Sequence, residues 1–275
     1  MSDIVLQAKN LFYQYPTRSD YALRDISISI KRGEFVALIG QNGSGKTTLV
    51  KHFNGLLKPT AGGMIVEGRE TTDLLTSELA KSVGYVFQNP DHQIFAEKVR
   101  DEIAFGPKNL GFDEQHINKT IEIVLEDVGL SGFEDTMPFT LSRGQRQRLA
   151  VAAILAMEPS ILIVDEPTTG QDWKESISIM ELVKHLNNKG HTCIMITHNM
   201  NLVSLYAQRV IVMSDGEVLL DGPTQDMFRE TETLMRAGIK PPEVYVLTKA
   251  IFPDIQLDKL ISPKDLASLM IERLL

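Results

Sequence analysis

Residues 40–47 read GQNGSGKT, which places glycines ahead of a lysine and a threonine. Glycines let the backbone turn so that successive N–H groups face one point, where they can hold a phosphate beside the positive end of a following helix. In a loop of this pattern Lys46 reaches the β- and γ-phosphates of a nucleotide, and Thr47 holds Mg²⁺. The residues from which we expect nucleotide contacts are Gly40, Gln41, Asn42, Gly43, Ser44, Gly45, Lys46, Thr47 and Thr48. The loop alone predicts a nucleotide site and leaves the reaction open.

Two acidic residues and a histidine supply candidate catalytic groups. Asp165 and Glu166 end the apolar run ILIVDEP, and His198 follows the run CIMIT. Asp165 is placed to bind Mg²⁺ through water, and Glu166 to orient and deprotonate a water that attacks the γ-phosphate. His198 is a candidate donor to the γ-phosphate and to that water. Taken alone, Asp-Glu-Pro reads more simply as a turn that ends a strand, and the glycine loop makes the catalytic interpretation the stronger one.

Three apolar runs are expected to position these groups. Residues 35–40, 160–166 and 192–198 have the length and β-branching of buried parallel strands. Because ligands of open α/β sheets sit where parallel strands end, we predict one site at that edge. Ahead of these runs, residues 4–36 alternate in polarity, which predicts an antiparallel sheet.

The rest of the chain divides into a helical insert, a hairpin and a helical tail. Residues 89–157 have a helical, polar-interrupted pattern, and residues 210–223 read as a hairpin that turns at Asp215-Gly216. Beyond Pro223 the periodicity is helical up to Leu275 and contains no chemical motif. We therefore place a domain boundary near residue 223.

Composition and charge limit the classes of partner. The formal net charge of −8 and the pI of about 5.3 argue against a basic surface for nucleic acid, so we expect no nucleic-acid partner. The longest strongly apolar stretch, residues 149–157, is shorter than the roughly 20 residues that span a bilayer. The N-terminus lacks the apolar core of a signal peptide. We expect no direct membrane span, and Cys193 reads as a core thiol in a reducing compartment.

Five motifs in a fixed order give a specific resemblance. They are the glycine loop, Gln88 in YVFQNP, LSRGQRQRLA at 141–150, ILIVDEPTTGQD at 161–172, and ITH at 196–198. This order over residues 4–222 resembles ATP-binding cassette (ABC) transporter ATPases. The resemblance implies an α/β P-loop NTPase fold with an ABC-type antiparallel β subdomain, a helical insert subdomain at about 89–157 and a small C-terminal helical extension. It implies an ATPase domain over residues 1–222 and an extension over residues 223–275.

The resemblance also implies roles for individual residues. Tyr15 would stack on adenine, with Tyr13 or Phe12 as alternatives if the register differs. Gln88 would ligate Mg²⁺ together with Thr47 and Asp165, and would sense the γ-phosphate. ATP would lie between two head-to-tail subunits, so that one chain holds half of each site. The residues implied to act on the partner's nucleotide, or to link the two sites, are Ser142, Gly144, Gln145 and Asp172.

Two residues depart from the family's pattern. Arg143 stands where the signature usually has a second glycine, and Gln171 stands where a leucine is common. An arginine there can attract phosphate or can obstruct a close backbone approach. We favour the permissive alternative because Ser142 and Gly144 are retained.

The segment 87–109 and residues 236–252 are similar to energy-coupling factor transporter ATPases, which energise uptake of vitamins and of cobalt or nickel ions. This similarity implies an ATP-binding and ATP-hydrolysing subunit, in a homo- or heterodimer, peripheral to the cytoplasmic face of the cell membrane beneath transmembrane transporter subunits. We expect part of the segment to form a groove for a partner helix, with Asp101 or Glu102 meeting an arginine, although core packing explains most of its apolar residues. The alternatives are a conventional ABC importer and a non-transport ABC ATPase.

Overall fold

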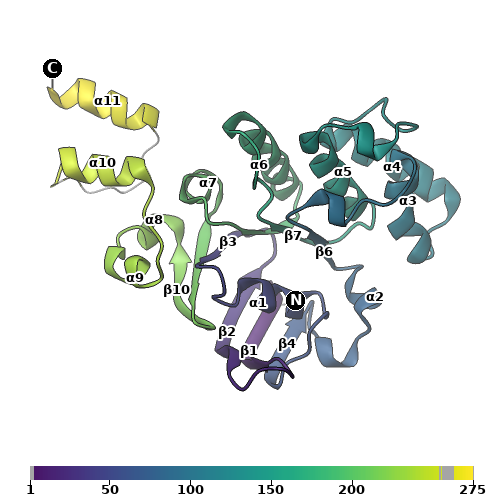
Figure 1. The fold of residues 1–275 in the computed structure, drawn as a ribbon, viewed down its shortest axis with the longest axis horizontal. Helices are drawn as coiled ribbons and strands as arrows, with labels where there is room; N and C mark the ends of the chain where they lie inside the picture. Colours follow the sequence, from purple (N-terminus) through teal and green to yellow (C-terminus); the bar gives the residue numbers. More distant parts are fainter. Residues whose placement is uncertain (1–2, 254, 256–262, 275) are drawn as a thin grey trace.

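A six-stranded sheet forms the centre of the computed structural model, which describes residues 3–253, 255 and 263–274 (Figure 1). Its strand order is β10-β9-β3-β8-β7-β6, and all neighbours pair in parallel except β9 and β10. The strands are β3 (Phe35–Gly40), β6 (Val83–Val86), β7 (Ile161–Asp165), β8 (Thr192–Ile196), β9 (Arg209–Ser214) and β10 (Glu217–Pro223). Asp165 pairs with Ile196, and Gly40 pairs with Met213. The carboxyl ends of β3, β7 and β8 therefore meet at one edge, as the sequence predicted.

The central strands are buried on both faces, which explains their continuous apolar sequences. Val36 and Leu38 face a core that contains α1 (Lys46–Phe53) and the second sheet, whereas Ala37 and Ile39 face the helices on the other side. Cys193 is buried in β8, and burial raises the pKa of its thiol to about 12. This is the environment of a core thiol.

The second sheet is antiparallel and has the order β2-β1-β4-β5. Its strands are β1 (Ile4–Gln14), β2 (Tyr21–Lys31), β4 (Ala61–Val66) and β5 (Arg69–Glu70). Figure 1 shows it below the central sheet, with α1 between the two. The alternating sequence of β2 buries one face, which carries Ile26, Ile28 and Ile30, and exposes much of the other.

Helices cover the opposite face of the central sheet and extend into the insert. The helical elements between β5 and β7 are η1 (Thr71–Asp73), α2 (Thr76–Leu79), η2 (Pro90–His92), α3 (Val99–Asn109), α4 (Glu114–Val128), η3 (Pro138–Thr140) and α5 (Arg143–Leu155). The helices α6 (Trp173–Asn188) and α7 (Met200–Tyr206) follow β7 and β8. Figure 1 shows α3, α4 and α5 projecting together at one end of the molecule.

The C-terminal part is helical and begins within the main core. Its helices are α8 (Thr224–Met227), α9 (Thr231–Arg236), α10 (Glu243–Ile251) and α11 (Pro263–Leu274). Phe228, Leu234 and Ile239 are buried in the same cluster as the central sheet, whereas α10 and α11 lie at the far end of the molecule (Figure 1). Among the helices of the described residues, none combines the length and apolar character that a membrane span requires.

Candidate functional site

The loop after β3 has a backbone that favours glycine. Gly40 has φ +155°, and a Cβ there would lie 2.3 Å from the carbonyl oxygen of Met213. The Ser44 N–H donates to the Gln41 carbonyl oxygen at 3.1 Å, and α1 then begins at Lys46. The first amides of a helix have no partners within the helix, so the loop presents N–H groups and a positive helix end. An anion such as a phosphate fits this arrangement.

Lys46 lies at the floor of this loop with 7% of its surface exposed. Its Nζ donates to the carbonyl oxygens of Gly40 at 2.9 Å and of Gln41 at 2.8 Å. Burial lowers the pKa of Lys46, and the carboxylates of Glu166 and Asp165 partly oppose that shift. The loop carbonyls thus hold the ammonium group next to the place where a phosphate would bind.

Glu166 is fixed by contacts from its own loop and from two distant segments. It has φ +43°, a backbone conformation that is uncommon for a non-glycine residue and is concentrated at functional sites. Its Oε2 accepts from Gln88 Nε2 at 3.0 Å and from Thr169 Oγ1 at 2.9 Å, and its Oε1 lies 3.1 Å from His198 Nδ1. The carboxylate is 15% exposed and the imidazole 70%, so the pair can reach a bound ligand from one side.

Asp165 has a partner that the sequence analysis did not identify. The Tyr85 hydroxyl donates to Asp165 Oδ2 at 2.5 Å. Burial raises the pKa of Asp165, and this hydrogen bond opposes the shift. Asp165, Thr47 and Gln88 line one cleft and offer carboxylate, hydroxyl and amide oxygens, which are the ligands that Mg²⁺ takes in proteins. Within the described residues, no group of three or more His, Cys, Asp or Glu side chains could hold a metal ion.

These groups share one cleft of about 1560 Å³. The predicted residues that line it are Tyr15, Gly40, Gln41, Asn42, Gly43, Gly45, Lys46, Thr47, Thr48, Gln88, Asp165, Glu166 and His198. Ser44 is not in the lining, because it is 4% exposed and its side chain turns into the loop. The lining at the loop includes the polar or charged side chains of Gln41, Lys46 and Thr47, which suit a charged ligand.

Tyr15 is the aromatic residue of its strand end that faces the cleft. Its hydroxyl lies 3.0 Å from Thr48 Oγ1, and its ring is half-buried. Tyr13 is 8% exposed and packs edge-on against His52 at 4.8 Å, and Phe12 packs against Tyr21. Neither Tyr13 nor Phe12 is part of the cleft lining.

The signature residues lie outside the cleft. Ser142 caps α5: the Gln145 N–H donates to Ser142 Oγ at 3.2 Å, and the Ser142 N–H donates to Gln145 Oε1 at 2.9 Å. Asp172 caps α6 by accepting from the Glu175 N–H at 2.8 Å. Ser142, Gly144, Gln145 and Asp172 are all absent from the cleft lining of the described chain. The structure thus brings the loop, acid and histidine residues together and leaves the signature apart.

Arg143 contacts the loop that follows Glu166. Its Nη2 donates to the Thr169 carbonyl oxygen at 2.8 Å, and a Cβ at Gly170 would lie 2.6 Å from its Nη1. The guanidinium therefore lies along residues 169–170 of its own chain. Sequence analysis anticipated an effect of Arg143 on phosphate or on backbone approach and did not anticipate this contact.

Sequence reasoning also missed the second wall of the cleft. Residues 238–243 and Val246 line it from the C-terminal part, which contains no recognisable motif. Tyr85 had a weak signal, because it lies in YVFQNP, three residues before Gln88. Residues 238–243 and Val246 had no signal in the sequence, because their position depends on how α8 and α9 pack.

Comparisons with known proteins agree on the family. Residues 23–169, more than half of the chain, match the ABC transporter family. The chain is 43% identical over 242 residues to the energy-coupling factor transporter ATP-binding protein EcfA of Methanocaldococcus jannaschii, covering 87% of this chain and 86% of that protein. It is 51% identical over 249 residues to an ABC transporter ATP-binding protein of Caldanaerobacter subterraneus subsp. tengcongensis; that match covers 90% of this chain but 44% of that relative's length.

Solved structures agree with the fold. The structure of cbiO1 from Clostridium perfringens, part of the ABC transporter complex cbiONQ, matches with a TM-score of 0.79 at 36% identity over 90% of this chain and 100% of that chain. A dimeric ATP-binding cassette in a post-hydrolysis state with ADP and Pi matches with a TM-score of 0.70 at 32% identity, over 80% of this chain and 98% of that chain. These matches confirm the predicted fold class. The chain belongs to the ABC transporter family and is similar to the energy-coupling factor transporter ATP-binding proteins.

Proposed function

We propose that this chain binds and hydrolyses ATP with Mg²⁺ and thereby energises a membrane importer of the energy-coupling factor type. The observation that supports this most is the placement of Lys46 and the Glu166–His198 pair in one cleft. In this proposal residues 1–222 form the ATPase domain, with the helical insert at about 89–157, and residues 223–275 form the extension.

The phosphates bind at the loop, and each neighbouring group has one task. The amides of residues 40–48 and the Lys46 ammonium hold the triphosphate, and the Tyr15 ring stacks on adenine. Thr47, Gln88 and Asp165 hold Mg²⁺. When bound, the ion neutralises charge that develops on the phosphate oxygens.

Glu166 is the proposed general base, and His198 is the proposed hydrogen-bond donor to the γ-phosphate. The Glu166 carboxylate takes a proton from water while the water oxygen bonds to the γ-phosphorus and the bond to the ADP oxygen breaks. Gln88 and Thr169 donate to the other carboxylate oxygen, which leaves Oε1 aimed toward His198. His198 donates a hydrogen bond to the γ-phosphate and helps to orient the attacking water.

We propose that a second ABC subunit completes each site. Ser142, Gly144 and Gln145 present the N-terminus of α5, an anion site, on a surface away from their own cleft. The dimeric cassette among the structural neighbours supports this arrangement. Asp172 lies in the loop that links the two sites, and the dimer can be homo- or heteromeric.

The insert carries the proposed contact with the transmembrane subunits. Phe95 and Phe105 are 60% and 50% exposed and pack edge-on with ring centroids 4.7 Å apart. Asp101 is exposed beside them, whereas Glu102 is 3% exposed and accepts from the N–H groups of Phe95 and of the next residue. The acid available to a partner's arginine is therefore Asp101, and Glu102 supports the loop that carries Phe95.

These features fit an importer subunit that is peripheral to the cytoplasmic face of the membrane. The names of the relatives support the energy-coupling factor type, whose members take up vitamins or cobalt and nickel ions. A conventional ABC importer is the alternative, and it would bring a different membrane partner.

Co-purification tests this proposal directly. The tagged chain is expressed with its neighbouring genes, extracted in mild detergent, and its membrane partners are identified by mass spectrometry. We expect Phe105→Ala and Asp101→Lys to lower recovery of the partner at least about fivefold, a loss of roughly 1 kcal/mol of binding free energy. Leu205→Ala, at an apolar residue on α7 that is 49% exposed, is the matched control and should recover normally. Unchanged recovery with both insert variants would contradict the docking surface.

A further inference from the structure

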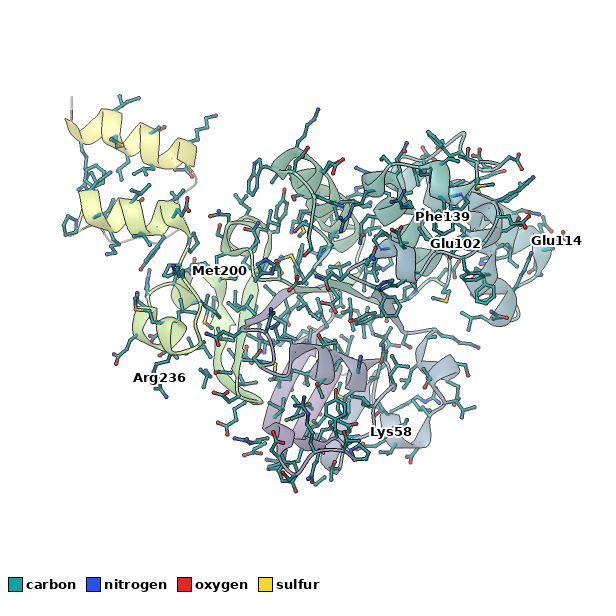
Figure 2. All side chains as sticks on the ribbon, in the orientation of Figure 1. Lys58, Glu102, Glu114, Phe139, Met200 and Arg236 are labelled. Atoms are coloured by element: carbon teal, nitrogen blue, oxygen red, sulfur yellow. The ribbon has the colours of Figure 1, made fainter. Side chains whose placement is uncertain are left out.

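The segment between α9 and α10 lies beside the phosphate loop. We name residues 238–243 (GIKPPE) the C-terminal wall. All six residues line the cleft that holds Lys46 and Glu166. Arg236, labelled in Figure 2, marks the end of α9 from which the wall begins, far from Glu102 in the insert. The extension therefore contributes to the same cleft as the nucleotide-binding loop.

The wall is anchored to the main core by its first residues. Gly238 ends α9 with φ +65°, and its N–H donates to the Met235 carbonyl oxygen at 2.9 Å. The Ile239 N–H donates to the Leu234 carbonyl oxygen at 2.8 Å, which is the hydrogen-bond pattern of a glycine helix cap. Leu234 and Ile239 are 0% and 6% exposed. Their burial fixes the position of Gly238.

Gly238 is in direct contact with Gln41 of the phosphate loop. A Cβ on Gly238 would lie 1.5 Å from Gln41 Nε2, 2.4 Å from Cδ and 2.7 Å from Cγ. The Gln41 side chain thus occupies the space that any larger residue at 238 would need. A substitution would have to move that side chain from Cγ outward, which means a different rotamer.

Gln41 is central to the conformation of the loop. Its carbonyl oxygen accepts from Lys46 Nζ at 2.8 Å and from the Ser44 N–H at 3.1 Å. A change in the Gln41 rotamer therefore acts on the residue whose carbonyl helps to hold the phosphate-binding lysine. Gln41 is an exposed residue of the loop, and the contact with Gly238 restricts the rotamers that its side chain can adopt.

We propose that Gly238 is a positioning residue of the nucleotide site: the C-terminal wall supports Gln41, and so the extension sets the affinity of the phosphate loop. The proposal rests on the proposed function, since it presupposes that the loop binds nucleotide. It assigns a role in the ATP site to a part of the chain that carries no ATPase motif.

A matched control distinguishes the proposed positioning role of Gly238 from a role as a helix cap alone. Gly129 ends α4 with φ +68°, and its N–H donates to the Glu126 carbonyl oxygen at 3.1 Å. A Cβ on Gly129 would meet only Arg148 Nη1, at an ordinary distance of 3.7 Å. Alanine at either position has the same backbone cost, and only at 238 does it meet Gln41.

The experiment measures ATP affinity by calorimetry in the full chain. We expect Gly238→Ala to raise the Kd for ATP about tenfold. Gly129→Ala should leave the Kd for ATP within about twofold of the wild-type value. It should lower Tm by about as much as Gly238→Ala does. In a Gln41→Ala background no side chain remains to be displaced, so adding Gly238→Ala should change the Kd by less than about twofold. Equal Kd values for Gly238→Ala and Gly129→Ala, or an undiminished effect in the Gln41→Ala background, would overturn the proposal.

Hydrogen exchange on the wild-type chain provides a test that needs no variant. ATP should slow exchange at residues 40–47 and also at the amides of residues 238–240 and 243, since Pro241 and Pro242 have none. Protection of the loop without protection of the wall would overturn the proposal. A wild-type chain that binds no ATP would overturn the proposed function and this inference with it, whereas a failure of Gly238→Ala alone would overturn only the inference.

Discussion

The cleft and the signature segment are built in opposite ways. In the cleft, Glu166 is held by two distant residues, Gln88 and His198, in addition to the nearby Thr169. In the signature, Ser142 and Gln145 satisfy each other within one helical turn. Long-range contacts complete a site only once the sheet has formed, whereas a local cap holds its shape without distant contacts. A site shared between two chains requires this difference. The fold of one chain assembles the cleft, and the signature segment is presented to the partner chain.

The largest expected effect comes from the base in the cleft. Glu166→Gln keeps an oxygen that can accept a hydrogen bond but removes the group that takes the proton. We expect phosphate release to fall by about 10²- to 10⁴-fold while ATP affinity changes little. Phosphate release and nucleotide binding are measured on the same preparation. Near-normal turnover would remove Glu166 from the role of base and would leave the cleft without its proposed function.

A smaller effect is expected at the signature. Ser142→Ala should lower phosphate release about 10- to 100-fold, the loss of one hydrogen bond to a charged group, without changing ATP affinity at concentrations where the chain is monomeric. The variant also removes a helix cap, which costs about 1 kcal/mol of folding stability. Asp113→Ala removes the equivalent cap of α4, where Asp113 accepts from the His116 N–H, and is the control. Equal losses of activity in the two variants would mean that Ser142 acts only as a cap.

The smallest effect is expected at the residue that connects the two regions. Arg143 belongs to the signature segment but donates to Thr169, whose hydroxyl donates to Glu166. Because this contact is at an exposed carbonyl, Arg143→Gly should change phosphate release by less than about threefold. A rise of tenfold or more in steady-state ATPase activity would show that the arginine obstructs the approach of a nucleotide.

The outcomes at neighbouring residues show where sequence reasoning succeeds. The three buried strands were predictable. A short apolar run such as Phe35–Gly40, which contains β-branched residues and ends in glycine, has the length of a strand and is too short for a typical buried helix. Asp101 and Glu102 are adjacent acids with nothing in the sequence to separate them. The structure turns Glu102 inward onto two backbone amides and leaves Asp101 exposed, because α3 buries only one side.

The sequence by itself determined the phosphate loop, the order of the motifs and the family, because these depend on local backbone geometry and on residue types at fixed spacing. Only the tertiary structure decided which residues share the cleft with the loop. The contacts of Gly238 with Gln41, of Tyr85 with Asp165 and of Arg143 with Thr169 join segments far apart in the chain. Their positions follow from the packing of whole helices and strands, and no local pattern records that packing.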